Sequence, residues 1–233
     1  MSPSPETTRG IVRYAVKMIL FQAVFGLILF LAAGRLDWKE GWAYMGLNLL
    51  TQVLSGLILI PIRPEMIAER SKMREGTKNW DRILAPAVAM LGPLVWMVTA
   101  GLDKRFTWSA PLPPWLWIAS LGLGLLASLF VIWAMAHNAF FAATVRIQTD
   151  RGQSVVSSGP YAWVRHPGYL GSVVYDLFAP LMLGSWWAYV PVLVVLALIF
   201  VRTRLEDATL QAELPGYAEY AARVRWRLIP GLW

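Results

Sequence analysis

The chain contains no cysteine and only two histidines among its 233 residues. The missing cysteines exclude disulfides, thiolate metal sites and cysteine nucleophiles. The two histidines, His137 and His166, form neither an HxxxH nor an HExxH pattern. Because protein metal sites combine several such ligands at short spacing, we expect no metal centre.

Several motifs of soluble enzymes are also missing. No GxGxxG follows a predicted strand, and neither GxxxxGK[ST] nor a GxSxG-like nucleophile elbow is present. These absences argue against a Rossmann site, a P-loop and an α/β-hydrolase. Any nucleotide-like cofactor would therefore occupy a pocket of another kind.

Charge is scarce, and apolar side chains are abundant. Only 15% of the residues are charged and 57% are hydrophobic, whereas soluble domains carry about 25% charged residues. The 13 tryptophans and eight tyrosines suit a chain with rings at two membrane interfaces. The net charge of +7 then indicates topology and contact with anionic lipids, and no nucleic-acid partner is expected.

Four apolar runs, at about 11–33, 42–62, 83–101 and 115–136, are each close to the ~20 residues that cross a bilayer. The first lacks a small-residue cleavage site, so we interpret it as a retained span and not a signal peptide. Residues 63–82, with ten charges, are predicted as a surface loop or interfacial helix.

A further apolar stretch, 169–201, is interrupted by Pro180 and Gly184. We interpret it as a hairpin of two short or tilted helices bent near Gly184–Ser185; one long kinked helix is the alternative. The tail, 202–233, is polar and predicted to be amphipathic. The fold class is therefore all-α: a multi-pass transmembrane helical protein with four spans plus a bent helical hairpin.

Lysine and arginine placement predicts the orientation. With the N-terminus inside, the outer loops hold only Arg35, Lys39, Lys104 and Arg105, and the other 17 of the 21 basic residues lie inside. This asymmetry follows the positive-inside rule and places both termini in the cytoplasm. We expect a bacterial inner-membrane protein, with residues 137–171 and the tail on the same cytoplasmic side.

The segment "SSGPYAWVRHPGYLG" (157–171) gathers distinct polar and aromatic groups. Tyr161, Trp163, Arg165, His166 and Tyr169 fall within nine residues, and Pro160 and Pro167 stiffen the backbone of this stretch. Such stiffening pre-organises a binding surface. The alternative is a turn-rich connector whose arginine contacts lipid phosphates.

Ionisable residues follow or interrupt the apolar hairpin. Arg202 and Glu206 are spaced i,i+4 and share a helix face, so they form either a surface ion pair or the mouth of a membrane-facing pocket. Asp176 lies within the hairpin and needs a partner or water that the sequence does not identify. Ionisable groups in such places are functional candidates.

Together, "VVSSGPYAWVRHPGYLG", the broken hairpin and "RTRLEDATLQAELPGYAEYAARVRWRLIPG" resemble the isoprenylcysteine carboxyl methyltransferase family, which overlaps phospholipid methyltransferases and NnrU-like membrane proteins. The resemblance covers about residues 137–233. It implies two regions: N-terminal transmembrane helices (1–136) and a methyltransferase-like catalytic region (137–233). It also implies a membrane enzyme that uses S-adenosyl-L-methionine.

The resemblance assigns roles by position. Arg202 corresponds to the catalytic arginine on the substrate side. The residues that correspond to the cofactor-binding set are Gln148, Gln153, Ser154, Val155, Val156, Tyr161, His166, Pro167, Gly168, Tyr169 and Glu206. At the first of these positions, Arg146 is an alternative alignment to Gln148. In this assignment Glu206 accepts from the cofactor's ammonium or ribose, and His166 with backbone N–H groups holds its carboxylate.

The implied activity is methyl transfer to a lipophilic small molecule or a lipid-anchored acceptor. Carboxyl O-methylation is favoured, and phospholipid N-methylation and thiol S-methylation are alternatives. Two other function classes remain open: an NADPH-dependent reductase of the sterol-reductase type, with Arg146 or Arg151 at the 2′-phosphate, and a non-catalytic transport or partner protein. Membrane lipids are expected partners in each case.

Overall fold

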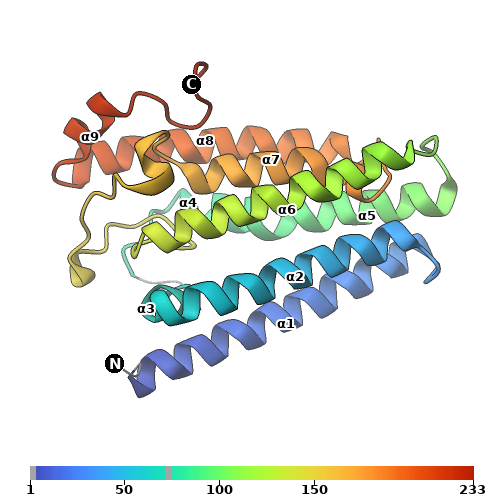
Figure 1. The fold of residues 1–233 in the computed structure, drawn as a ribbon, viewed down its shortest axis with the longest axis horizontal. Coiled ribbons are helices and arrows are strands. Elements are labelled where there is room, and N and C mark those ends of the chain that lie inside the picture. The colour runs from blue at the N-terminus through green and yellow to red at the C-terminus, as the bar shows by residue number, and fades with distance from the viewer. Residues whose placement is uncertain (1–3, 72–74) are drawn as a thin grey trace.

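The computed structural model describes residues 4–71 and 75–233, and every regular element in these ranges is helical (Figure 1). The long helices are α1 (Pro5–Ala33), α2 (Lys39–Ile62), α5 (Gly92–Phe106), α6 (Pro114–His137), α7 (Pro167–Met182) and α8 (Tyr189–Glu213). The short ones are α3 (Pro64–Glu69), α4 (Asp81–Pro86), the π-helical turn η1 (Ala87–Leu91), the 3-10 turns η2 (Thr149–Arg151) and η3 (Gly159–Ala162), and α9 (Tyr217–Arg223).

Four stretches of the described chain are long and apolar enough to cross a membrane: Pro5–Ala33, Lys39–Ile62, Asp81–Phe106 and Pro114–His137. They confirm the four predicted spans, and the protein is a multi-pass helical membrane protein. The third span is continuous through α4, η1 and α5. It begins at Asp81, inside the segment predicted as a surface loop or interfacial helix, because the helix extends two residues beyond the apolar run that starts at Ile83.

The apolar stretch after residue 168 forms two helices, so the predicted hairpin is confirmed and the single kinked helix is wrong. The chain turns between α7 and α8 at Gly184, whose φ of +70° lies in the region that favours glycine. Pro180 does not mark the turn, since it lies within α7. The tail does not start a separate element, because α8 continues without a break to Glu213.

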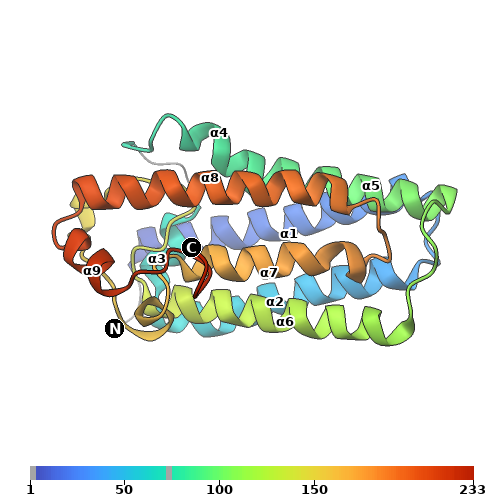
Figure 2. The same cartoon turned by 90° about the horizontal axis from the view of Figure 1, so that it is seen from above.

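The bundle has two unlike ends. Figures 1 and 2 show α3, α9 and the connector between α6 and α7 gathered at one end, whereas the opposite end holds only the turns between long helices. The N-terminal end of α1 also lies at the first end. Segments far apart in the sequence therefore meet at the end that the charge pattern predicts to be cytoplasmic.

Helices α6 and α7 pack closely through small residues. A Cβ added at Gly171 of α7 would lie 2.5 Å from Cγ2 of Val131 and 3.1 Å from the backbone oxygen of Ala127, both on α6. A Cβ at Gly124 would lie 2.7 Å from Cε of Met182. Small residues let helix backbones approach each other in membranes. The close packing fixes α7 against α6, and so fixes the position of the connector that joins these two helices.

We expect Gly171→Ala to lower the thermal stability of the detergent-purified protein, because the new methyl group overlaps atoms of α6, at a cost of roughly 1–3 kcal/mol. Gly122→Ala is the matched control on the outer face of α6: nothing lies within 4 Å of its Cβ position, and alanine favours a helix. Equal unfolding temperatures for the two variants would contradict this packing.

Candidate functional site

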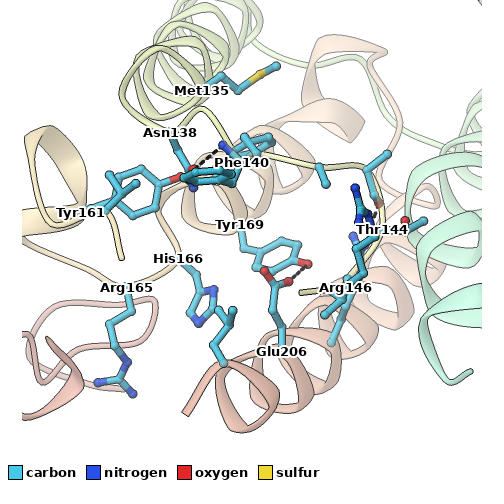
Figure 3. Close-up of a pocket in the computed structure, with 18 of the residues that line it drawn as sticks. Met135, Asn138, Phe140, Thr144, Arg146, Tyr161, Arg165, His166, Tyr169 and Glu206 are labelled. Carbon is cyan, nitrogen blue, oxygen red and sulfur yellow. Dashed lines mark hydrogen bonds between the residues drawn. The ribbon is translucent and has the colours of Figure 1, made fainter. Parts of the chain in front are cut away.

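A cavity of about 390 Å³ opens between the connector, α7 and the polar half of α8. Small-molecule sites span roughly 300–1,000 Å³. The connector supplies one wall, from Asn138 to Tyr161, and Glu206 of α8 lies on the opposite side (Figure 3). Arg202 of α8 also lines the cavity. The inner wall comes from α6, α7, η1 and α5.

A buried ion pair joins α8 to the start of the third span. Arg202 Nε donates to Asp81 Oδ1 at 2.6 Å and its Nη2 donates to Oδ2 at 3.1 Å. Asp81 is fully buried and also accepts from the backbone N–H of Val145 at 2.6 Å. Arg202 Nη2 donates to the carbonyl of Ala143 at 2.9 Å. The pair thus holds the connector against both helices.

A second buried carboxylate, Asp207, accepts hydrogen bonds from the connector and from the C-terminal tail. It accepts from Nε and Nη2 of Arg165 at 2.7 and 3.0 Å, and from Nε of Arg227 at 2.9 Å. Nε2 of His166 lies 3.2 Å from its Oδ1. Burial alone would raise the pKa of Asp207, but the hydrogen bonds from His166 and the two arginines hold that pKa well below its usual value.

The C-terminal segment is fixed to the connector by the same residues. The backbone N–H groups of Arg165 and His166 donate to the carbonyls of Trp226 and Arg227, each at 2.9 Å. Nη1 of Arg165 donates to the carbonyl of Val224 at 2.8 Å. The "VRHP" portion of the connector is therefore a joint between α7, α8 and the tail.

Glu206 and Tyr169 meet in the cavity. The Tyr169 hydroxyl donates to Glu206 Oε2 at 2.5 Å (Figure 3). Cζ of Arg202 lies 5.3 Å from the centroid of the Tyr169 ring. Glu206 forms no ion pair with a described basic residue, so the predicted surface pair of Arg202 and Glu206 is wrong. Arg202 pairs with Asp81 instead, and both Arg202 and Glu206 line the cavity, as the alternative prediction expected.

Polar contacts within the connector shape its wall. Gln148, 1% exposed, donates from Nε2 to the carbonyl of Phe140, and its backbone N–H donates to Oε1 of Gln153, both at 2.6 Å. Nδ2 of Asn138 donates to the hydroxyl of Tyr161 at 3.1 Å (Figure 3). Burial raises the pKa of Tyr161, so this hydroxyl stays neutral at physiological pH.

Arg146 and Arg151 already have partners. Arg146 donates to Asp150 at 2.7 Å and to Glu69 at 2.8 Å, and its hydrogen bond to Asp150 raises its pKa further. Arg151 donates to Oε1 of Gln148 and to the carbonyl of Ala139. Arg70 differs, since its buried Nε has no hydrogen-bond partner and its Cζ lies 5.4 Å from the Phe141 ring centroid.

The structure brings almost all of the predicted site residues to this cavity. Those that line it are Gln148, Gln153, Ser154, Val155, Val156, Tyr161, His166, Gly168, Tyr169, Arg202 and Glu206. Pro167 is not among the lining residues; it occupies the first turn of α7, where proline is well tolerated. Within the described ranges, no group of three or more potential His, Cys, Asp or Glu ligands is placed to hold a metal ion.

Sequence reasoning missed Asp81, Arg70 and the role of Asp207. Asp81 and Arg70 lie in the charged segment 63–82, where nothing in the sequence separates them from surface charges. The signal for Asp207 was stronger, because it directly follows Glu206 in the polar half of the helix. Its partners became apparent only when the tail was seen to fold back onto the connector.

Part of the chain is similar in sequence to a known protein family. The sequence model of the isoprenylcysteine carboxyl methyltransferase (ICMT) family matches residues 120–212, which run from α6 to the end of α8 and include most of the cavity walls. The match covers less than half of the chain. It confirms the predicted resemblance and supports a membrane-embedded methyltransferase.

Two curated proteins are similar over part of their length. The lamin-B receptor of Drosophila melanogaster is 32% identical over 135 residues, which are 53% of this chain and 18% of that protein. The cobalt-zinc-cadmium resistance protein CzcN of Cupriavidus metallidurans is 34% identical over 122 residues, which are 50% of this chain and 49% of that protein. The chain thus matches at most about half the length of these relatives.

The Asp207 contacts predict a pH-dependent stability. Asp207→Asn leaves Arg165 buried without its anionic partner, at an expected cost of ~3–5 kcal/mol. Because the folded-state pKa of Asp207 is depressed, its contribution is complete above the unfolded-state value of about 3.9 and is lost as the pH falls below it. The unfolding temperatures of wild type and variant, measured in detergent, should differ by a constant amount from pH 8 to about 5 and converge below about pH 4.

A difference in unfolding temperature that disappears between pH 8 and 6 would contradict the depressed pKa assigned to Asp207.

Proposed function

We propose that the protein is an integral membrane methyltransferase that transfers a methyl group from S-adenosyl-L-methionine to a lipophilic or amphipathic acceptor. The observation that carries the proposal is the convergence of two separated segments, 148–169 and 202–206, on one cavity, within the part of the chain that the ICMT family model matches. When bound, this cofactor supplies an electrophilic methyl group on a sulfonium.

The charges of the cavity suit such a cofactor, which carries an ammonium, a sulfonium and a carboxylate. Glu206 offers a carboxylate whose known partner is the neutral hydroxyl of Tyr169, so it is placed to accept from the ammonium. Arg70 offers a buried donor without a partner, which suits the carboxylate. Asp207 already engages Nε2 of His166, leaving Nδ1 for the ligand.

The backbone between Gln153 and Val156 forms the remaining wall. These residues line the cavity and lie outside any helix. The N–H of Gln153 already donates to the carbonyl of Gln148 at 3.2 Å, so the backbone groups of residues 154–156 are the ones that would meet the edges of an adenine or ribose. Tyr161, neutral and held by Asn138, offers an aromatic ring beside them. Precise placement matters because methyl transfer depends mainly on alignment of the reacting atoms and on exclusion of water.

The partners of Arg146 and Arg151 weigh against the NADPH alternative. A 2′-phosphate requires basic groups that can turn toward it. Arg146 already pairs with Glu69 and Asp150, and Arg151 already donates to Gln148 and Ala139 of the connector.

We assign Arg202 as a positioning residue on the acceptor side, because its pair with Asp81 fixes the connector and its guanidinium lies against the ring of Tyr169. In this proposal the cavity faces the cytoplasm of a bacterial inner membrane.

Calorimetric titration of the purified protein tests the cofactor. We expect S-adenosylhomocysteine to bind and NADPH not to bind. Glu206→Gln should weaken S-adenosylhomocysteine binding at least ~10-fold, because it removes the charged acceptor of the ammonium.

Glu213→Gln is the matched control on the same helix, since Glu213 is half-exposed and paired with Lys78; it should leave the affinity unchanged. Binding of NADPH without S-adenosylhomocysteine would overturn the proposed class. Equal affinities of the two glutamine variants would overturn the role of Glu206.

A further inference from the structure

Asp176 is an acidic residue buried within the apolar hairpin. It lies in the middle of α7, is 7% exposed and lines the same cavity as Tyr169 and Glu206. The function proposed above uses Glu206 for the cofactor and gives Asp176 no role. A carboxyl group in such surroundings is costly unless a donor or cation satisfies it.

The cavity-lining residues of α7 form one face. Gly168, Ser172 and Asp176 are spaced by four residues, and Tyr169 precedes Asp176 by seven; all four line the cavity. At a rise of 1.5 Å per residue, Asp176 lies about 10 Å further along the helix than Tyr169. The cavity therefore continues from the polar cofactor end along α7 toward the membrane interior.

The walls near this inner part come from the transmembrane helices. They are Val88 and Ala89 of the π-helical turn and Pro93 of α5, whereas Val131 and Met135 of α6 line the part nearer Gly171 and Phe141. These side chains are apolar, and π-helical turns occur frequently at functional sites. The inner part of the cavity thus suits an acyl or alkyl chain.

No hydrogen bond or ion pair to Asp176 is found among residues 4–71 and 75–233. Ser172 lies on the same helix face, but its hydroxyl donates to the carbonyl of Gly168 at 3.1 Å. The carboxyl group of Asp176 is therefore left to a bound molecule. In an apolar cavity this group selects for a cation or a hydrogen-bond donor.

The cations that line the cavity do not offset Asp176. Arg146, Arg165 and Arg202 are paired with other carboxylates. Arg70 stacks on Phe141, whose ring would contact a Cβ at Gly168, about two turns of α7 away from Asp176. A lipophilic carboxylate in the inner cavity would therefore have no cation beside it.

We propose that the methyl acceptor is a lipophilic amine whose nitrogen binds to Asp176 while its hydrocarbon chain occupies the apolar part of the cavity. This inference rests on the proposed function and narrows its acceptor. The amine enters as an ammonium and transfers one proton to the Asp176 carboxylate. The free lone pair forms the new N–C bond as the S–CH₃ bond breaks, and the products are an N-methylammonium, which now carries the positive charge of the former sulfonium, and neutral S-adenosylhomocysteine. The proton then leaves Asp176 for water.

Carbodiimide labelling tests the binding step without turnover. A hydrophobic carbodiimide is added to the purified protein saturated with S-adenosylhomocysteine, and modification of Asp176 is quantified by mass spectrometry. We expect labelling of Asp176 that N,N-dimethyldodecylamine suppresses and 1-dodecanesulfonate, at the same mole fraction in the detergent micelle, does not; neither amphiphile couples to a carbodiimide-activated carboxyl group. Absence of labelling, or equal suppression by both amphiphiles, would overturn the proposal; suppression by dodecanol or dodecanethiol and not by the amine would do the same.

Two variants separate this inference from the proposed function. Asp176→Asn keeps the size of the side chain and should retain S-adenosylhomocysteine affinity while methyl transfer to dodecylamine falls at least ~100-fold. Asp37→Asn, in an exposed outer turn, should match wild type in both assays. If wild type binds S-adenosylhomocysteine and Asp176→Asn loses no activity, or wild type transfers no methyl group to the amine, the inference fails alone. If wild type does not bind S-adenosylhomocysteine, the proposed function fails with it.

Discussion

The bidentate ion pair between Asp81 and Arg202 is the contact on which the cavity depends. It connects the first residue of the third span to the point where α8 leaves the apolar layer. Because the same aspartate accepts from the N–H of Val145 and the same arginine donates to Ala143, the pair also holds the connector. Removing either charge would leave the other buried, which is among the most destabilising changes a protein core can undergo.

The Asp81–Arg202 pair also determines the net charge of the cavity. It removes Arg202 from the groups available to an anionic ligand, and Asp207 does the same for Arg165. The carboxylates that remain are Glu206 at the cofactor end and Asp176 at the membrane end. A cavity with this pattern favours two cationic ligands, one at each end, and the neutral Tyr169 hydroxyl stands on the α7 face between them.

The sequence predicted the spans because long apolar runs report directly on bilayer thickness. It also predicted most of the cavity wall, since a stiff aromatic segment such as 160–169 is unusual between spans. It could not predict the partner of Arg202. The i,i+4 spacing pointed to an ion pair with Glu206. The observed partner of Arg202 is Asp81, 121 residues away, which is fully buried and also accepts a hydrogen bond from the N–H of Val145. Nor did the sequence show how far the cavity extends along α7, which depends on how η1 and α6 pack around it.

The central claim is that S-adenosylmethionine occupies the cavity between the connector and α8. Ultraviolet cross-linking with the cofactor labelled on its methyl group tests it most directly, with tryptic peptides assigned by mass spectrometry. The account predicts label in peptides 152–165 and 166–202, abolished by excess S-adenosylhomocysteine. Label confined to residues 1–62, or label that S-adenosylhomocysteine does not displace, would contradict it.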